Sequence, residues 1–132
     1  PVVAETGTQW LNSSDGQILD QAVAALHRRI PAGGTSLFQA FQAAAALSPR
    51  PDNILLVTDG LPTQGKRKPL RTTVSAEQRL GHFQKALDLL PRGVPVNTIL
   101  LPMEGDAYAA AAFWQLAVAS EGAFLTPSRD WP

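Results

Sequence analysis

The chain has 132 residues, of which 45% are hydrophobic and 17% are charged, which is typical of one globular domain and excludes a disordered chain. The 11 basic and 11 acidic side chains cancel, so no overall charge favours nucleic acid or an anionic membrane surface. The absence of cysteine excludes disulfides and thiolate metal sites.

The first 13 residues carry short strand-like pieces at 2–5 and 9–11 and are expected to be weakly structured or to form an edge strand. Ser14 and Gln17 then have the spacing of a capping box, which predicts the start of a helix. The apolar positions of that helix recur every four residues, at Ile18, Ala22, Leu26 and Ile30. Pro31 is expected to end it.

A second helix is predicted after a two-glycine turn at Gly33-Gly34. Ser36 and Gln39 repeat the capping-box spacing, and an alanine-rich apolar run extends to Leu47. Two prolines follow within four residues and end the helix.

The next segment, Ile54 to Val57, is a run of four large aliphatic residues. Such a run has no polar face, so it predicts a strand of a parallel sheet that is buried on both faces. Asp59 and Gly60 follow where this strand leaves the sheet. Ligands of open α/β sheets bind at the carboxyl ends of the strands, which makes Asp59 the first candidate functional residue.

An irregular segment, 61–73, carries four cations. They are Lys66, Arg67, Lys68 and Arg71. The cluster is interpreted either as a solvated surface loop or as a patch that binds a partner or a phosphate group.

The remainder of the chain alternates helices and strands. A capping box at Ser75 and Gln78 predicts the start of a helix that reaches Leu90, and a strand is expected at 94–101. A helix capped by Asp106 is then expected at 107–120, followed by a short strand at 123–126. Gly122 is predicted to be the left-handed residue that ends the last helix. This order predicts an α/β fold with parallel strands joined by right-handed crossovers, in a single domain with a tail at 127–132.

A catalytic triad is poorly supported, because neither His27 nor His82 has the spacing that would link it to a nucleophile. The glycine turn at 33–36 lacks the lysine of a phosphate-binding loop, which argues against a nucleotide. Thr35 and Asp59 can instead face the same rim of the sheet. Hydroxyl and carboxylate oxygens suit Mg²⁺, although the same residues also serve as helix and turn caps.

Four segments of the chain, taken in order, resemble von Willebrand factor A domains. They are Gly33-Gly34-Thr35-Ser36-Leu37, Ile54 through Thr63, Val94 through Ile99, and Leu116-Ala117 through Gly122-Ala123-Phe124. The resemblance implies a Rossmann-like, three-layer αβα fold with a mainly parallel sheet. It also implies a metal-ion-dependent adhesion site that binds an acidic residue of a protein partner through Mg²⁺. A domain of this kind is a non-enzymatic interaction module. By this resemblance Thr35 matches the second metal motif and Asp59 the third, with Ser36 as a further possible ligand.

The first metal motif of the family, Asp-x-Ser-x-Ser, is missing, because no aspartate here is followed by serines at those spacings. The chain, residues 1–132, is therefore interpreted as an N-terminally truncated domain, and it is expected to bind Mg²⁺ weakly or not at all. The strand at 54–57 would then lack a neighbour, so a homodimer formed by strand exchange or edge pairing is expected, or a rearranged N-terminal segment.

Two other functions stay open. One is a metal-free structural or assembly domain that pairs through the sheet edge or the basic loop. The other is a hydrolase that uses Asp59 with Asp106 or Glu104. The chain begins with proline, which predicts an excised or processed piece, and no apolar run has the roughly 20 residues of a membrane span. The compartment is not determined.

Overall fold

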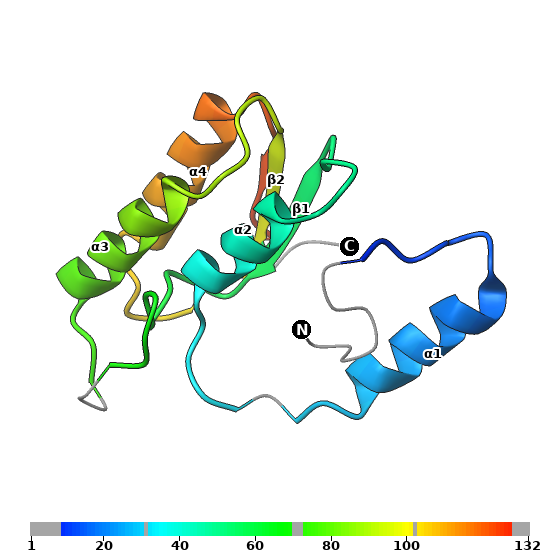
Figure 1. The fold of residues 1–132 in the computed structure, drawn as a ribbon. Helices are drawn as coiled ribbons and strands as arrows, with labels where there is room; N and C mark the ends of the chain where they lie inside the picture. Colours follow the sequence, from blue (N-terminus) through cyan, green and yellow to red (C-terminus); the bar gives the residue numbers. More distant parts are fainter. Residues whose placement is uncertain (1–8, 31, 70–72, 102, 128–132) are drawn as a thin grey trace.

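A computed structural model of the chain describes residues 9–30, 32–69, 73–101 and 103–127, which form an α/β structure of four helices and three strands (Figure 1). The elements in chain order are α1 (Gly16–His27), α2 (Leu37–Ala45), β1 (Ile54–Thr58), α3 (Ala76–Leu87), β2 (Val96–Leu100), α4 (Ala109–Ala119) and β3 (Phe124–Leu125). Each helix and strand expected between residues 14 and 126 is present, with ends shifted by a few residues.

The three strands form one parallel sheet in the order β1-β2-β3, as predicted. Val57 lies beside Ile99, and Ile99 lies beside Leu125, so these residues form one row across the sheet. The crossover through α3 leads from β1 to its neighbour β2, and the crossover through α4 leads from β2 to its neighbour β3, in the same direction across the sheet. Because both crossovers are right-handed, α3 and α4 lie on the same face of the sheet.

The core lies between that face and α2, α3 and α4. Phe41 of α2, Phe83 of α3 and Phe113 of α4 are each at most 3% exposed and pack with Val96 and Leu100 of β2. The rings of Phe83 and Phe113 meet edge to face with their centroids 5.1 Å apart. This arrangement confirms the α/β class and makes two layers, one of strands and one of helices.

The opposite face of the sheet is open. Alternate residues of a strand point to opposite faces, so Leu55 and Val57 of β1, Ile99 of β2 and Leu125 of β3 lie on this side. Leu55 is 68% exposed and Val57 57% exposed. The prediction that this strand is buried on both faces is therefore wrong for the part of the chain that the structure describes, and no described element supplies the third layer of the expected αβα arrangement.

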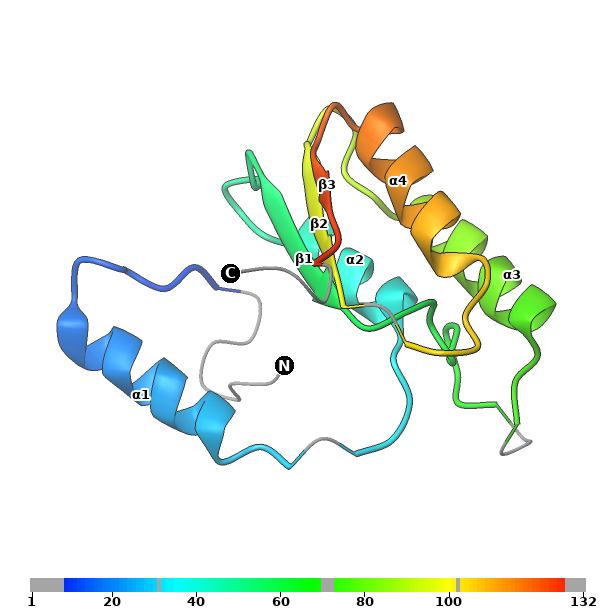
Figure 2. The same cartoon turned by 180° about the vertical axis from the view of Figure 1, so that it is seen from behind.

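Helix α1 lies apart from the sheet and from the other helices (Figures 1 and 2). Its start differs from the prediction, because the cap is Asp15, whose carboxylate accepts hydrogen bonds from the N–H groups of Gln17 and Ile18. Ala22 is buried, but Leu26 and Ile30, which were expected on the core side, are 52% and 87% exposed. Residues 9–13 form no strand.

Two of the other predicted helix starts are confirmed. Ser36 caps α2, and Ser75 and Gln78 form the reciprocal capping box of α3. Hydrogen bonds from its own backbone N–H and from the Ser75 hydroxyl lower the pKa of Glu77. The start of α4 differs, because its first cap position is Tyr108 and no side chain bonds there.

The end of α4 corrects the role of Gly122. Glu121, with φ at 58°, is the left-handed residue. Its N–H bonds the carbonyl of Val118 (3.3 Å) and the N–H of Gly122 bonds that of Ala117 (2.8 Å), which is the pattern of a Schellman motif. Gly122 is instead required by space, since a Cβ atom there would overlap the backbone carbonyl of Val96.

Some sequence predictions lie outside the described residues: the strand-like piece at 2–5, Arg71 of the basic cluster, and the tail after Pro127. None of the helices in the described ranges is long and apolar enough to cross a membrane.

Thr98 of β2 provides a test of the core. It is 1% exposed, and its hydroxyl has no hydrogen-bond partner among the described residues. We expect Thr98→Val to raise the free energy of unfolding by about 1 kcal/mol, because a buried hydroxyl without a partner loses its hydration without compensation. Urea unfolding followed by circular dichroism measures this. Thr126→Val, at an exposed site, is the control, and a destabilised Thr98→Val variant would contradict the assignment.

Candidate functional site

Asp59 lies at the carboxyl end of β1, where the sequence placed it. The turn after it is fixed by Thr58, whose buried hydroxyl donates to the carbonyl of Gly60 (3.0 Å). Leu61 and Pro62 then point into the core, both nearly fully buried. Asp59 itself is exposed, and its carboxylate makes no hydrogen bond or ion pair with any described residue, so it faces solvent as a free acceptor.

The loop that carries Thr35 packs directly against the segment that follows Asp59. The N–H of Thr35 donates to the Thr63 hydroxyl (3.1 Å), and the N–H of Gln64 donates to the carbonyl of Thr35 (3.0 Å). A Cβ atom on Gly34 would overlap the side chains of Thr63 and Gln64, so only glycine allows this approach. The backbone thus brings the Thr35 turn and the Asp59 turn to the same rim of the sheet, and the side chain of Thr35 is exposed there.

Ser36 does not serve as a free ligand. Its hydroxyl accepts from the N–H of Gln39 (3.3 Å) and donates to the carbonyl of Gly65 (2.8 Å). These bonds cap α2 and tie the helix to the loop after β1. The role of Ser36 in this structure is therefore to hold the rim together.

Asp106, from the loop after β2, lies beneath the same rim. Its side chain is 1% exposed and pairs with Arg79 of α3, with 2.8 Å between Oδ2 and Nη2. The same Oδ2 accepts from the N–H of Leu61 (2.7 Å), while Arg79 donates through Nε (3.1 Å) and Nη2 (2.6 Å) to the carbonyl of Leu61. The pair clamps the backbone just after Asp59. The prediction that Asp106 caps the last helix is wrong, because its carboxylate is used here.

The oxygen donors at the rim are few. Among the described residues, no group of three or more His, Cys, Asp or Glu side chains could hold a metal ion. Glu104, in the loop after β2, is exposed, as are the two predicted donors, the Thr35 hydroxyl and the Asp59 carboxylate. These two oxygens would make up only part of the coordination shell of Mg²⁺. Mg²⁺ keeps several waters and takes one or two carboxylates, so other ligands would supply most of its coordination.

The basic cluster borders this rim. Lys66, Arg67 and Lys68 follow directly after the segment that contacts Thr35, and all three are exposed. Their exposure is compatible with both interpretations of the loop, a solvated surface and a partner-binding patch.

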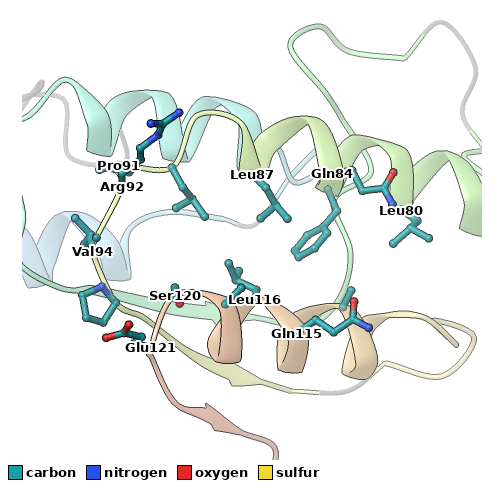
Figure 3. Close-up of a pocket in the computed structure, with 16 residues that line it drawn as sticks. Leu80, Gln84, Leu87, Pro91, Arg92, Val94, Gln115, Leu116, Ser120 and Glu121 are labelled. Carbon is teal, nitrogen blue, oxygen red and sulfur yellow. The ribbon is translucent and has the colours of Figure 1, made fainter.

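A cavity among the described residues lies elsewhere. It has a volume of about 580 Å³ and lies between α3 and α4, near the amino end of β2, so it is at the opposite end of the sheet from Asp59. Leu87 and Leu116 face each other across it (Figure 3). Its lining is mostly apolar, and neither Thr35 nor Asp59 contributes to it.

Comparison with known proteins identifies no family for this chain. No family model matches this chain, and no significant match was found to a curated protein or to a solved structure. The likeness to von Willebrand factor A domains stands on the segments quoted from the sequence.

Arg79 is the residue of this region that sequence reasoning missed. It lies in the first turn of α3, and its partner is 27 positions away, so no local spacing relates the two.

Proposed function

We propose that this chain is a non-enzymatic protein-interaction module of the von Willebrand factor A type, whose binding site is the rim that carries Thr35 and Asp59. In this role Asp59 and Thr35 help to hold Mg²⁺, and the partner contributes an acidic side chain to the same ion. The metal supplies positive charge between two carboxylates that would otherwise repel each other.

The packing of the Thr35 turn against the segment after Asp59 carries this proposal. Three features support it: the two hydrogen bonds that join the Thr35 backbone to the Thr63 hydroxyl and the Gln64 N–H, the close approach allowed by Gly34, and the exposed carboxylate of Asp59, which has no partner among the described residues. A carboxylate at the carboxyl end of a parallel strand is placed where open α/β sheets bind ligands. Below it, the pair of Arg79 and Asp106 holds the backbone of this turn through hydrogen bonds to the N–H and the carbonyl of Leu61.

Titration with Mg²⁺ tests the proposal. In the isolated chain we expect a dissociation constant on the order of 1 mM or weaker, because two protein oxygens hold the ion poorly. The backbone NMR signals of Thr35, Asp59 and Gly60 should shift and saturate, and these shifts should vanish in Asp59→Asn, which keeps the shape and removes the charge.

Asp52→Asn is the matched control, because Asp52 is also exposed but precedes β1 at its other end. A rim whose signals do not move with Mg²⁺ would contradict a metal role. Micromolar affinity would instead contradict the view that this chain holds an incomplete site.

A second candidate function keeps the fold and omits the metal. β1 is an edge strand of the described sheet, and the face beside it is apolar and exposed. A domain of this kind assembles through its sheet or through the loop of Lys66, Arg67 and Lys68, and its partner binding survives Asp59→Ala. The hydrolase alternative is less well supported, since Asp106 is buried in its pair with Arg79 and is not free to act with Asp59. Glu104, the other partner considered for Asp59, is exposed in the loop after β2.

A further inference from the structure

The loop after β1 carries the densest group of cations in the chain. Residues 60–76 contain four cations and no acidic residue, although the net charge of the whole chain is zero. Three of these cations, Lys66, Arg67 and Lys68, belong to the described residues, and all three are exposed. None of the three forms an ion pair with a described residue. The loop therefore presents three adjacent positive charges that no described side chain neutralises.

The base of this loop is held by two helices. The carbonyl of Gly65 accepts the hydroxyl of Ser36 (2.8 Å), which joins the loop to the start of α2. Gly65 also packs on His82 of α3, since a Cβ atom at this glycine would lie 3.0 Å from Nδ1 of that ring. Lys66 follows this anchored and buried glycine directly. The place where the positive charge begins is therefore set by α2 and α3.

Lys85 adds a fourth cation from α3. It lies one turn after His82, and both line a pocket of about 420 Å³ together with Pro69, the residue that follows Lys68. Lys85 is exposed, and it forms no ion pair with Asp88, the acidic residue three positions further along α3. We call Lys66, Arg67, Lys68 and Lys85 the basic surface.

The basic surface lies beside the rim that carries Thr35 and Asp59. The carbonyl of Thr35 accepts the N–H of Gln64 (3.0 Å), and the next residue, Ser36, bonds Gly65, so the two turns run side by side as far as Lys66. Lys66 is seven positions after Asp59, which places the two at most about 24 Å apart. An extended peptide of about eight residues is long enough to contact both.

The charge and the small extent of the basic surface indicate what binds there. Its positive charge favours an anion. Proteins that bind a nucleic acid duplex typically neutralise about six to ten phosphates. Four cations on a chain without net charge are too few for such a broad polyanion. A short acidic stretch of a protein needs only these contacts, and the proposed metal site also requires an acidic partner.

We propose that the partner of this chain presents a run of acidic residues, one of which binds Mg²⁺ at Thr35 and Asp59 while the following ones bind the basic surface. The first contact rests on the proposed function, whereas the contacts with the basic surface need no metal. The cations beside the rim repel Mg²⁺, and an acidic segment neutralises them. Mg²⁺ and the segment therefore strengthen each other's binding.

Fluorescence anisotropy with two labelled peptides tests the proposal. One peptide carries five aspartates in a glycine-serine background, and the other carries five asparagines at the same positions. In EDTA at low salt, only the aspartate peptide should bind, and its affinity should fall as NaCl is added. The triple variant Lys66→Gln, Arg67→Gln, Lys68→Gln should weaken this binding about tenfold, because each exposed charge pair contributes about two- to fivefold.

A second triple variant, Arg28→Gln, Arg50→Gln, Arg92→Gln, is the matched control. These arginines are exposed and lie outside the loop, and their replacement changes the net charge by the same amount. The control should change the affinity for the aspartate peptide by less than about twofold, since separated surface charges are largely screened. Circular dichroism and urea unfolding verify that both variants keep the fold.

Three results would overturn the inference. The first is no binding of the aspartate peptide to the parent chain in EDTA. The second is equal weakening by the two triple variants, which would show a response to net charge alone. The third is an oligothymidylate of the same charge that binds the basic surface at least as tightly as the peptide.

Failure of the metal site has a different signature. If Mg²⁺ does not raise the affinity of the parent chain for the aspartate peptide, while the first triple variant still weakens binding in EDTA, the proposed metal role is wrong and the basic surface stands. If Mg²⁺ raises the affinity in the parent chain and not in Asp59→Asn, both the metal role and the coupling are supported.

Discussion

Asp106→Ala is expected to lower the free energy of unfolding by about 3–5 kcal/mol, the cost of removing one partner from a buried ion pair. The change leaves the Arg79 guanidinium, which is 13% exposed, beneath the rim without its counter-charge. It also removes the acceptor for the N–H of Leu61, a nearly fully buried residue. Both losses act on the backbone directly after Asp59, so the rim should loosen together with the fold.

Urea unfolding followed by circular dichroism measures the effect, with Asp88→Ala as control. Asp88 ends α3, is exposed, and makes no side-chain bond with a described residue, so its removal should change stability by less than about 0.5 kcal/mol. The double variant Asp106→Ala with Arg79→Ala should lose less than the sum of the two single losses, because the second change removes the stranded charge. Additive losses would show that the pair does not act as a unit.

Gly122→Ala is expected to destabilise the chain by about 3 kcal/mol, the upper part of the range for overpacking a well-packed site. The added Cβ atom would overlap the carbonyl oxygen of Val96, which is backbone and cannot rotate away. Either β2 or the end of α4 has to move, and with it the hydrogen bond from the N–H of Thr98 to the carbonyl of Ala123 (2.8 Å). The position of β3 beside β2 therefore depends on this glycine.

The same substitution at Gly81 is the matched control and should have the opposite sign. Gly81 lies in the interior of α3, and a Cβ atom there meets no other atom within 4 Å. Alanine should stabilise the helix by about 1 kcal/mol relative to glycine. If both variants changed stability in the same direction, the close contact between Gly122 and Val96 would not be the cause.

Only part of the candidate site could be predicted from local sequence. The strand end at Asp59 and the helix start at Ser36 were predictable, because each depends on residues within a few positions. The engagement of the Ser36 hydroxyl by Gly65 was not, since these residues come together through the packing of two loops 29 positions apart. Asp106 was assigned to the nearest helix for the same reason, and its true partner is in another helix.

The exposure of the strands also could not be predicted from local sequence. Four aliphatic residues in a row predicted burial on both faces, and that inference is sound for a strand between two helical layers. Whether the second layer exists depends on which side the crossover helices take. The order β1-β2-β3 places α3 and α4 on one side, so Leu55 and Val57 stay exposed.

By itself the sequence determined the α/β class, the alternation of helices and strands, the parallel sheet, and the carboxyl-end position of Asp59. These depend on periodicity, capping residues and connection length, which act over short stretches of chain. Only the tertiary structure decided the partner of Asp106, the left-handed residue at the end of α4, the pairing of the Thr35 loop with residues 63–64, and the face that the helices leave open. Each of these depends on contacts between residues far apart in the chain, which the packing of the sheet and helices creates.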